Sequence, residues 1–149
     1  MAPTSQESAN RKPAGQESAG QAPVFLEHVN FTVKNAKATA EELCALFDWQ
    51  IRWHGEALEG RGETYHIGSE TSYLALYSPN SGAEQPDTDT YTTQQGLNHI
   101  GFVVPDIDAT EARVKAAGYK PGPQWDYEPG RRFYFNNQDG IEIEVVSYN

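Results

Sequence analysis

Two short stretches of the chain show the same alternation of apolar and polar residues. Residues 27–33 and 98–104 both run through His, a β-branched residue, a small or polar residue, Phe and, two positions later, Val. The apolar positions are Val29, Phe31 and Val33 in the first stretch and Ile100, Phe102 and Val104 in the second. Alternation with period 2 is typical of a strand with one buried face. We predict two strands with His28 and His99, which are 71 residues apart (99 − 28), on the face opposite the apolar side chains.

The stretch at 140–147 alternates in the same way and carries two carboxylates on one face. Ile141, Ile143 and Val145 fall on one face, and Glu142, Glu144 and Val146 fall on the other. An earlier stretch at 73–78 has the same pattern, and Ala75 stands there 69 residues before Glu144 (144 − 75). A dry carboxylate without a partner costs several kcal/mol. Glu144 therefore needs a polar or charged neighbour, whereas we interpret Glu142 as a solvated residue.

The remaining segments complete two similar halves. Helices are predicted at 35–47 and from Asp106 or Asp108 to Ala117, and strands at 49–53, 63–67, 73–77, 120–127 and 131–136. His54, next to Gly55, is predicted in a turn. Each half then has the order strand, helix and three strands, which indicates an internal duplication. We predict an α+β fold of two tandem βαβββ units at 25–78 and 96–148, joined by a linker at 79–95 without an apolar pattern.

Composition and charge limit the partners of this chain. Residues 1–23 are rich in Pro, Ser, Gln, Gly and Ala, so we predict a disordered tail before a single domain at 24–149. No apolar run is long enough for a signal peptide or a membrane span. The single Cys44 excludes an internal disulfide, so we expect a cytoplasmic protein without a membrane partner. A net charge of −10 and a pI near 4.7 argue against nucleic acid, which needs a basic surface.

The duplicated pattern resembles the vicinal oxygen chelate superfamily, which includes glyoxalases, extradiol dioxygenases and fosfomycin- and bleomycin-resistance proteins. The resemblance covers about residues 25–148 and rests on the two histidine strands in register and an Asp-Gly turn into the final strand. It implies a curved sheet around a cavity that holds one divalent ion. The ligands of that family sit where His28, His99 and Glu144 lie here. It also implies a homodimer, because two-unit relatives commonly pair their chains.

Two imidazoles and one carboxylate form a borderline donor set that suits Fe, Mn, Ni, Co or Zn alike. Three protein ligands leave positions open, so a substrate can bind such an ion through two adjacent oxygens. The ion then acts as a Lewis acid on the substrate. The alternative interpretation is that neighbouring residues satisfy His28 and His99, and that Glu144 pairs with an arginine.

Departures from the family patterns bear on the type of reaction. Metal-dependent glyoxalases generally carry a second glutamate where Ala75 stands, and fosfomycin-modifying relatives add a basic residue after the final strand, where none follows Ser147. The extradiol dioxygenase signature matches here at Tyr134 and Glu144 but has Gln138 in place of its Pro, and its upstream His is missing. A lyase or isomerase and a ring-cleaving dioxygenase both stay open.

Further side chains are candidates for catalysis and substrate binding. Tyr134 should face the cavity, where its phenol either donates to a substrate oxyanion or only lines the sheet. His66 is a candidate general base if its strand faces the cavity. Tyr73 and Tyr77 share the face of Ala75 and would line the pocket. Three arginines lie in or beside turns and could clamp a substrate carboxylate: Arg61, Arg131 and Arg132.

Two other functions compete with a metal-dependent enzyme. One is a metal-free protein that binds a drug or another small molecule in an aromatic groove, as bleomycin-resistance relatives do. The other is a regulatory or structural member of the superfamily. Because the chain keeps all three ligand positions, we predict a divalent-metal-dependent enzyme that acts on a small molecule.

Overall fold

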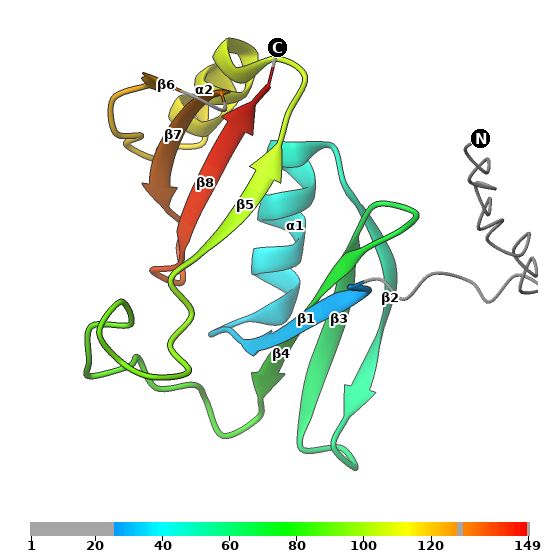
Figure 1. Cartoon of the computed structure of the whole chain (residues 1–149). Coiled ribbons are helices and arrows are strands. Elements are labelled where there is room, and N and C mark those ends of the chain that lie inside the picture. Colours follow the sequence, from blue (N-terminus) through cyan, green and yellow to red (C-terminus); the bar gives the residue numbers. More distant parts are fainter. Residues whose placement is uncertain (1–25, 128–129, 149) are drawn as a thin grey trace, which may run out of the picture.

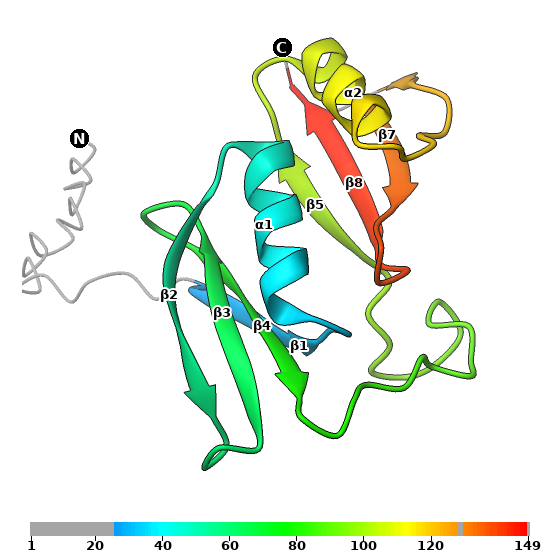
Figure 2. The ribbon, with the colours of Figure 1, turned by 180° about the vertical axis from the view of Figure 1, so that it is seen from behind.

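The computed structural model describes residues 26–127 and 130–148, so the tail predicted at 1–23 lies outside the described residues. The first unit forms a four-stranded sheet with strand order β1-β4-β3-β2 and one helix (Figures 1 and 2). Its elements are β1 (His28–Thr32), α1 (Ala36–Phe47), β2 (Gln50–Ala57), β3 (Gly62–Gly68) and β4 (Tyr73–Pro79). Strand β1 runs parallel to β4, and the other neighbours are antiparallel.

The second unit repeats this plan. Its elements are β5 (His99–Val103), α2 (Ile107–Ala116), β6 (Trp125–Tyr127), β7 (Gly130–Asn136) and β8 (Glu142–Ser147). The strand order β5-β8-β7-β6, with β5 parallel to β8, is the order of the first sheet. The prediction of an α+β fold with two tandem βαβββ units is therefore confirmed. We call the two sheets the first sheet and the second sheet.

Both helices begin at a capping side chain. The Oδ1 of Asn35 accepts a hydrogen bond from the backbone N of Ala38 at 3.0 Å, and Oδ1 of Asp106 accepts one from Ala109 N at 2.9 Å. Asp106 is thus the cap of α2, one of the two residues predicted. Gly118 follows this helix with a positive φ of 94°, which a glycine adopts without steric cost. Neither helix of the described ranges is long and apolar enough to cross a membrane.

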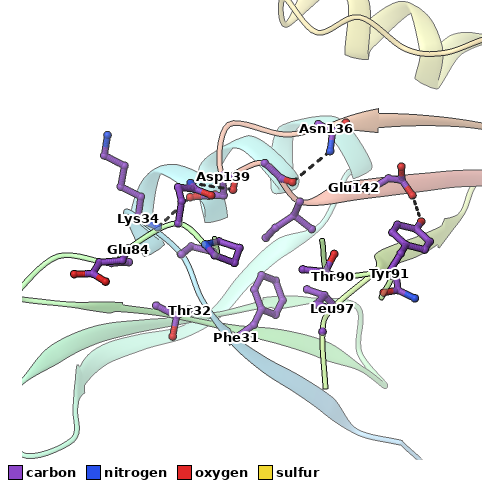
Figure 3. A pocket seen from close by; sticks show the side chains of 18 residues that line it. Phe31, Thr32, Lys34, Glu84, Thr90, Tyr91, Leu97, Asn136, Asp139 and Glu142 are labelled. Atoms are coloured by element: carbon purple, nitrogen blue, oxygen red, sulfur yellow. Dashed lines mark hydrogen bonds between the residues drawn. The ribbon is translucent and has the colours of Figure 1, made fainter. Parts of the chain in front are cut away.

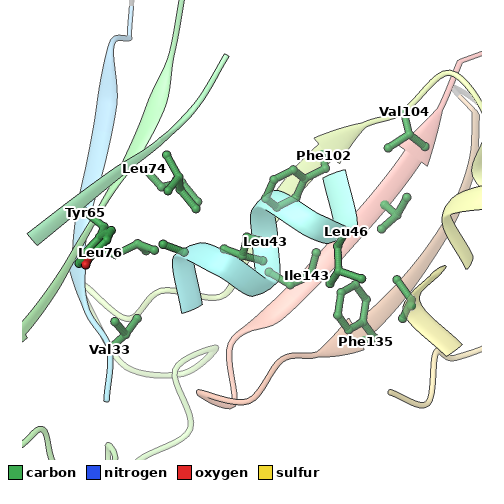
Figure 4. Packing of buried hydrophobic residues seen from close by; sticks show 14 of the residues in the cluster. Val33, Leu43, Leu46, Tyr65, Leu74, Leu76, Phe102, Val104, Phe135 and Ile143 are labelled. Atoms are coloured by element: carbon green, nitrogen blue, oxygen red, sulfur yellow. The ribbon is translucent and has the colours of Figure 1, made fainter. Parts of the chain in front are cut away.

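Helix α1 packs between the two sheets (Figures 2 and 4). Leu43 and Leu46 of this helix are buried together with Ile143 of the second sheet. Phe47 stacks on Phe102 of β5, with ring centroids 3.8 Å apart. The apolar faces of both sheets therefore share one core around α1. The opposite faces, which we call the open faces, point away from that core.

A polar contact also ties the two units together at the turn between β7 and β8. Asp139 in this turn accepts hydrogen bonds from Lys34 N at 3.0 Å and from Thr39 Oγ1 at 2.5 Å. Lys34 and Thr39 lie just before and within α1. The turn that leads into β8 is thereby fixed to the start of the helix of the other unit.

Two local predictions were wrong. The strand predicted at 120–127 is only β6, because Pro121 and Pro123 have no backbone N–H to give to a sheet. His54 and Gly55 lie inside β2 and not in a turn. The imidazole of His54 stacks on the ring of Tyr65 from β3, with centroids 5.0 Å apart, and this cross-strand pair supports the longer strand.

Candidate metal centre

His99 and Glu144 lie beside each other on the open face of the second sheet. In the parallel pair of β5 and β8, Gly101 stands opposite Glu144, two residues after His99. The Nε2 atom of His99 is 3.3 Å from Oε2 of Glu144. Gly101 has no side chain between them, and a Cβ there would lie 3.7 Å from this carboxylate oxygen. Two donor atoms bound to one ion at about 2.1 Å, about 90–110° apart, are separated by about 3.0–3.4 Å. The spacing of this pair therefore fits a shared divalent ion.

The other carboxylate oxygen of Glu144 has two partners from β7. Arg132 Nη1 and the phenol of Tyr134 each donate to Oε1 at 3.0 Å. The side chains of Glu144 and Arg132 are only 14% and 13% exposed. Burial and then the bond to Glu144 raise the pKa of Tyr134, so its hydroxyl stays protonated. Glu144 thus has the arginine partner that the metal-free interpretation required, together with a ring nitrogen on its free side.

Two of the hydrogen-bond donors of Arg132 are unpaired in the part of the chain that the structure describes. Within the described residues its Nε and Nη2 atoms are buried and have no hydrogen-bond partner. Its guanidinium lies over the ring of Tyr127, 4.7 Å from the centroid. The other two candidate arginines are used elsewhere: Arg131 binds Asp108 at 2.9 Å, and Arg61 donates to the backbone oxygen of Leu58. Of the three, Arg132 is the one beside Glu144.

The remaining candidates gather on the open face of the first sheet. The ring of Tyr73 stacks with His28 at 4.8 Å and with His66 at 4.6 Å between centroids. Arg52 lies over the Tyr73 ring at 4.8 Å. Burial first, and then the charges of His28 and Arg52, lower the pKa of His66. His66 therefore faces the same side as His28 and favours the neutral form, which is the form a general base needs. Tyr77 lies on this face too, two residues after Ala75, with its hydroxyl 3.4 Å from Arg61 O.

The chain does not bring His28 to His99 and Glu144. The two histidines belong to open faces that both point away from α1. Across residues 26–127 and 130–148, no three His, Cys, Asp or Glu side chains converge as a metal ion would require. One chain thus holds two ligands of the predicted set in one place and the third in another.

Two residues that the sequence analysis did not assign to the site also contact His99. Tyr91, from the linker, donates its hydroxyl hydrogen bond to Oε1 of Glu142 (Figure 3). The Tyr91 oxygen lies 3.3 Å from Nδ1 of His99. The bond to Glu142, and then burial, raise the pKa of Tyr91 to about 12. A cavity of about 570 Å³ lies under the linker, and both Tyr91 and Glu142 line it. The linker has no periodic pattern, so only the presence of a tyrosine in a polar loop marked this position.

A comparison with sequence models of protein families shows to which family this chain is related. Residues 25–145 match the sequence model of the Glyoxalase/Bleomycin resistance protein/Dioxygenase superfamily. The chain belongs to this superfamily. The match spans both histidine strands and Glu144, and it confirms the resemblance to the vicinal oxygen chelate proteins. No curated protein matches the chain at a significant level.

Solved structures of this superfamily share the fold. A glyoxylase/bleomycin resistance protein/dioxygenase domain from Frankia sp. EAN1pec is 22% identical, with 85% of this chain and 93% of that chain covered and a TM-score of 0.71. A glyoxalase family protein from Enterococcus faecalis is 18% identical, with 82% and 96% covered and a TM-score of 0.66. A mutant of the fosfomycin resistance protein FosX from Listeria monocytogenes, complexed with Mn(II) and 1S,2S-dihydroxypropylphosphonic acid, is 20% identical. It has 84% and 93% covered and a TM-score of 0.62.

Proposed function

We propose that this chain is a divalent-metal-dependent enzyme that binds a small substrate through two adjacent oxygens. The observation that carries the proposal is the 3.3 Å separation of His99 Nε2 and Glu144 Oε2, with a glycine beside them that leaves space. Imidazole and carboxylate together suit Fe, Mn, Ni, Co or Zn. The Mn(II) complex of the related FosX structure, which contains a compound with two adjacent hydroxyls, supports this class of site.

We further propose that the third ligand is His28 of a second copy of the chain. His28 lies on an open face equivalent to that of His99, and β1 and β5 are both edge strands with unpaired backbone groups. Large apolar side chains on or beside these faces are exposed, including Trp53 at 48% and Val103 at 66%. A homodimer that joins the first sheet of one chain to the second sheet of the other would cover them. Such a pairing also completes the His/His/Glu set.

The surrounding side chains then have distinct tasks. A bound divalent ion supplies Lewis acidity toward the two substrate oxygens. His66, with its lowered pKa, accepts a proton from the substrate at near-neutral pH. Tyr134, with its raised pKa, keeps its hydroxyl hydrogen and would donate it to a substrate oxyanion in exchange for its bond to Glu144 Oε1. The two unpartnered nitrogens of Arg132 would bind an anionic substrate group once the Tyr127 ring over the guanidinium moves aside, because both atoms are buried. Tyr73 lines the pocket. A lyase or isomerase and a ring-cleaving dioxygenase are both compatible with these roles.

The test combines metal analysis with mixed dimers. Untagged protein is expected to contain about one divalent ion per chain, and His28→Ala and Glu144→Gln should each lose it. If the site is shared, a heterodimer of these two variants contains one intact site and regains about one tightly bound Co(II) per dimer. The matched control is a heterodimer of His99→Ala and Glu144→Gln, which share one half-site and should regain none. Metal-free wild type, or a heterodimer that recovers nothing while wild type is loaded, contradicts the shared site.

A metal-free small-molecule-binding protein is the second candidate function. The observation that favours it is the Arg132–Glu144 ion pair at 3.0 Å, which satisfies this carboxylate without a metal. The stacked rings of His28, Tyr73 and His66 would then act as an aromatic groove. The same metal analysis separates the two functions, because this candidate predicts no specific metal binding and no loss on Glu144→Gln.

A further inference from the structure

The most informative unassigned feature is the hydrogen-bond chain that reaches His99 from the linker. Glu142 Oε1 accepts the hydroxyl hydrogen of Tyr91, and the Tyr91 oxygen lies 3.3 Å from His99 Nδ1. The direct separation of Nδ1 and Glu142 Oε1 is 3.9 Å, too long for a hydrogen bond. Tyr91 is therefore the link between the carboxylate and the imidazole.

Counting protons along this series of hydrogen bonds places a hydrogen on Nδ1 of the imidazole. An ionised carboxylate can only accept, so the single hydrogen of the Tyr91 hydroxyl goes to Glu142. The Tyr91 oxygen can then only accept from His99, which requires a hydrogen on Nδ1. If the imidazole is neutral it carries one N–H, so its Nε2 has a bare lone pair. That lone pair would face a Glu144 oxygen at 3.3 Å, an arrangement of two acceptors that a cation between them would satisfy. An imidazole protonated on both nitrogens would instead donate to Glu144 and leave no site for a cation.

The linker holds Tyr91 in place through its own contacts. Asp89 accepts a hydrogen bond from Tyr91 N at 3.0 Å and, through its backbone oxygen, one from Thr93 Oγ1 at 2.8 Å. Gly96 packs so closely on this turn that a Cβ there would lie 2.4 Å from Thr90 O. Contacts within the linker thus fix the backbone of Tyr91 beside His99.

We propose that Tyr91 and Glu142 are positioning residues that hold His99 in the Nδ1–H tautomer, with Nε2 free to bind a divalent cation. The role of these hydrogen bonds in metal binding rests on the proposed metal-dependent function. The hydrogen bonds themselves are present in the metal-free chain. Partners of this kind at the far nitrogen of a ligating histidine typically change metal affinity by about 10–100-fold.

The first readout is the tautomer of His99 in metal-free protein, measured by ¹⁵N NMR of the ring at about pH 8. Wild type should carry the proton on Nδ1. Tyr91→Phe removes the acceptor, so the proton should move to Nε2 and bond to Glu144. Glu142→Ala frees the Tyr91 hydroxyl to donate to Nδ1 and should have the same effect, whereas Glu142→Gln keeps an acceptor and should restore the Nδ1–H form. Tyr148→Phe, an exposed tyrosine outside the site, is the matched control and should match wild type.

The second readout is the dissociation constant for Co(II) alone. Tyr91→Phe and Glu142→Ala should weaken it by about 10–100-fold, and Glu142→Gln by much less. A proton on Nε2 in wild type, protons on both nitrogens, or a tautomer unchanged by Tyr91→Phe would overturn the inference, as would an unchanged Co(II) affinity in Tyr91→Phe. If wild type shows the Tyr91-dependent tautomer but binds no metal, the hydrogen-bond chain is supported and the proposed function fails.

Discussion

The two sheets have the same register but different chemistry. In the first sheet Asn30 and His66 both stand beside Ala75, whereas in the second Gly101 and Tyr134 both stand beside Glu144. The first strand of each unit begins with a histidine, at His28 and at His99. Where the first sheet has the methyl group of Ala75, the second has the carboxylate of Glu144. Where the first has the imidazole of His66, the second has the phenol of Tyr134.

Under the proposed function the two units contribute different groups to the site. The second sheet has the carboxylate of Glu144, with an arginine and a phenol bound to it, and the first sheet has an imidazole of lowered pKa among stacked rings. The second sheet alone would lack the candidate general base His66. The first sheet alone would lack a carboxylate at the position of Glu144 to bind a cation.

The largest effect is expected from Glu144→Gln, which makes the second sheet as uncharged at this position as the first. Removing one anionic ligand should weaken metal binding by about 100-fold, about 2.8 kcal/mol, and by tenfold at least. The metal-loaded form should lose more stability than the metal-free form, because binding is linked to folding. Equilibrium dialysis and thermal unfolding of both forms measure this.

The control for that change is Glu63→Gln, an exposed glutamate of β3, which should leave metal affinity unchanged. Glu142 lies one pleat from Glu144 and is no neutral control, because it is bonded to Tyr91. If Glu144→Gln and Glu63→Gln bind metal alike, the pair of His99 and Glu144 is a structural contact only.

The turns before the last strand of each unit also differ. Asp139 anchors the second turn to α1 with two hydrogen bonds, whereas the first turn, at 69–72, makes only local ones. Asp139→Ala should therefore lower the free energy of unfolding by about 1–2 kcal/mol. Thr71→Ala in the first turn should change it by less than about 0.5 kcal/mol. Urea unfolding of the metal-free chain compares them, and equal losses would show that the anchor contributes nothing.

A smaller effect is expected from Tyr134→Phe, which removes one donor from Glu144. The metal-free protein should lose about 0.5–1.5 kcal/mol of stability, the usual contribution of one hydrogen bond. With metal bound the loss should shrink, because the ion then also satisfies the carboxylate. Thermal unfolding with and without Co(II) measures the difference. A loss that is the same in both forms would indicate that Glu144 does not bind the ion.

The smallest effect concerns the titration of His66, the counterpart of Tyr134. Its pKa in the folded chain is lowered by burial and by the charges of His28 and Arg52, so the folded chain binds this proton less tightly than the unfolded chain. The stability that it contributes is present above the ordinary histidine range and falls as the pH drops through that range. NMR titration of the metal-free protein should give a pKa below the ordinary value. Arg52→Gln should raise it, and Lys37→Gln, on the exposed side of α1, should not.

Much of this molecule could be predicted from local patterns. The alternation of residues determined which side chains share a face, so Phe102 and Ile143 were expected in the core and His99 and Glu144 on the other side. The offsets of 71 and 69 residues likewise predicted that Ala75 takes the place of Glu144, and the strand register agrees. Period 2 is a property of the strand backbone, and it requires no knowledge of the rest of the fold.

Contacts between distant segments could not be predicted in this way. The packing of α1 against both sheets keeps His28 away from His99 within one chain, and the closure of the linker brings Tyr91 onto His99 and Glu142. Alternation places Arg132 on the face of Tyr134, but its bond to Glu144 also requires that β7 pairs with β8 in this register. The sequence by itself determined which face of its strand each of His28, His99 and Glu144 occupies, because alternation is local. Only the tertiary structure decided which of these side chains lie together and what surrounds them, because these contacts join residues far apart in the chain.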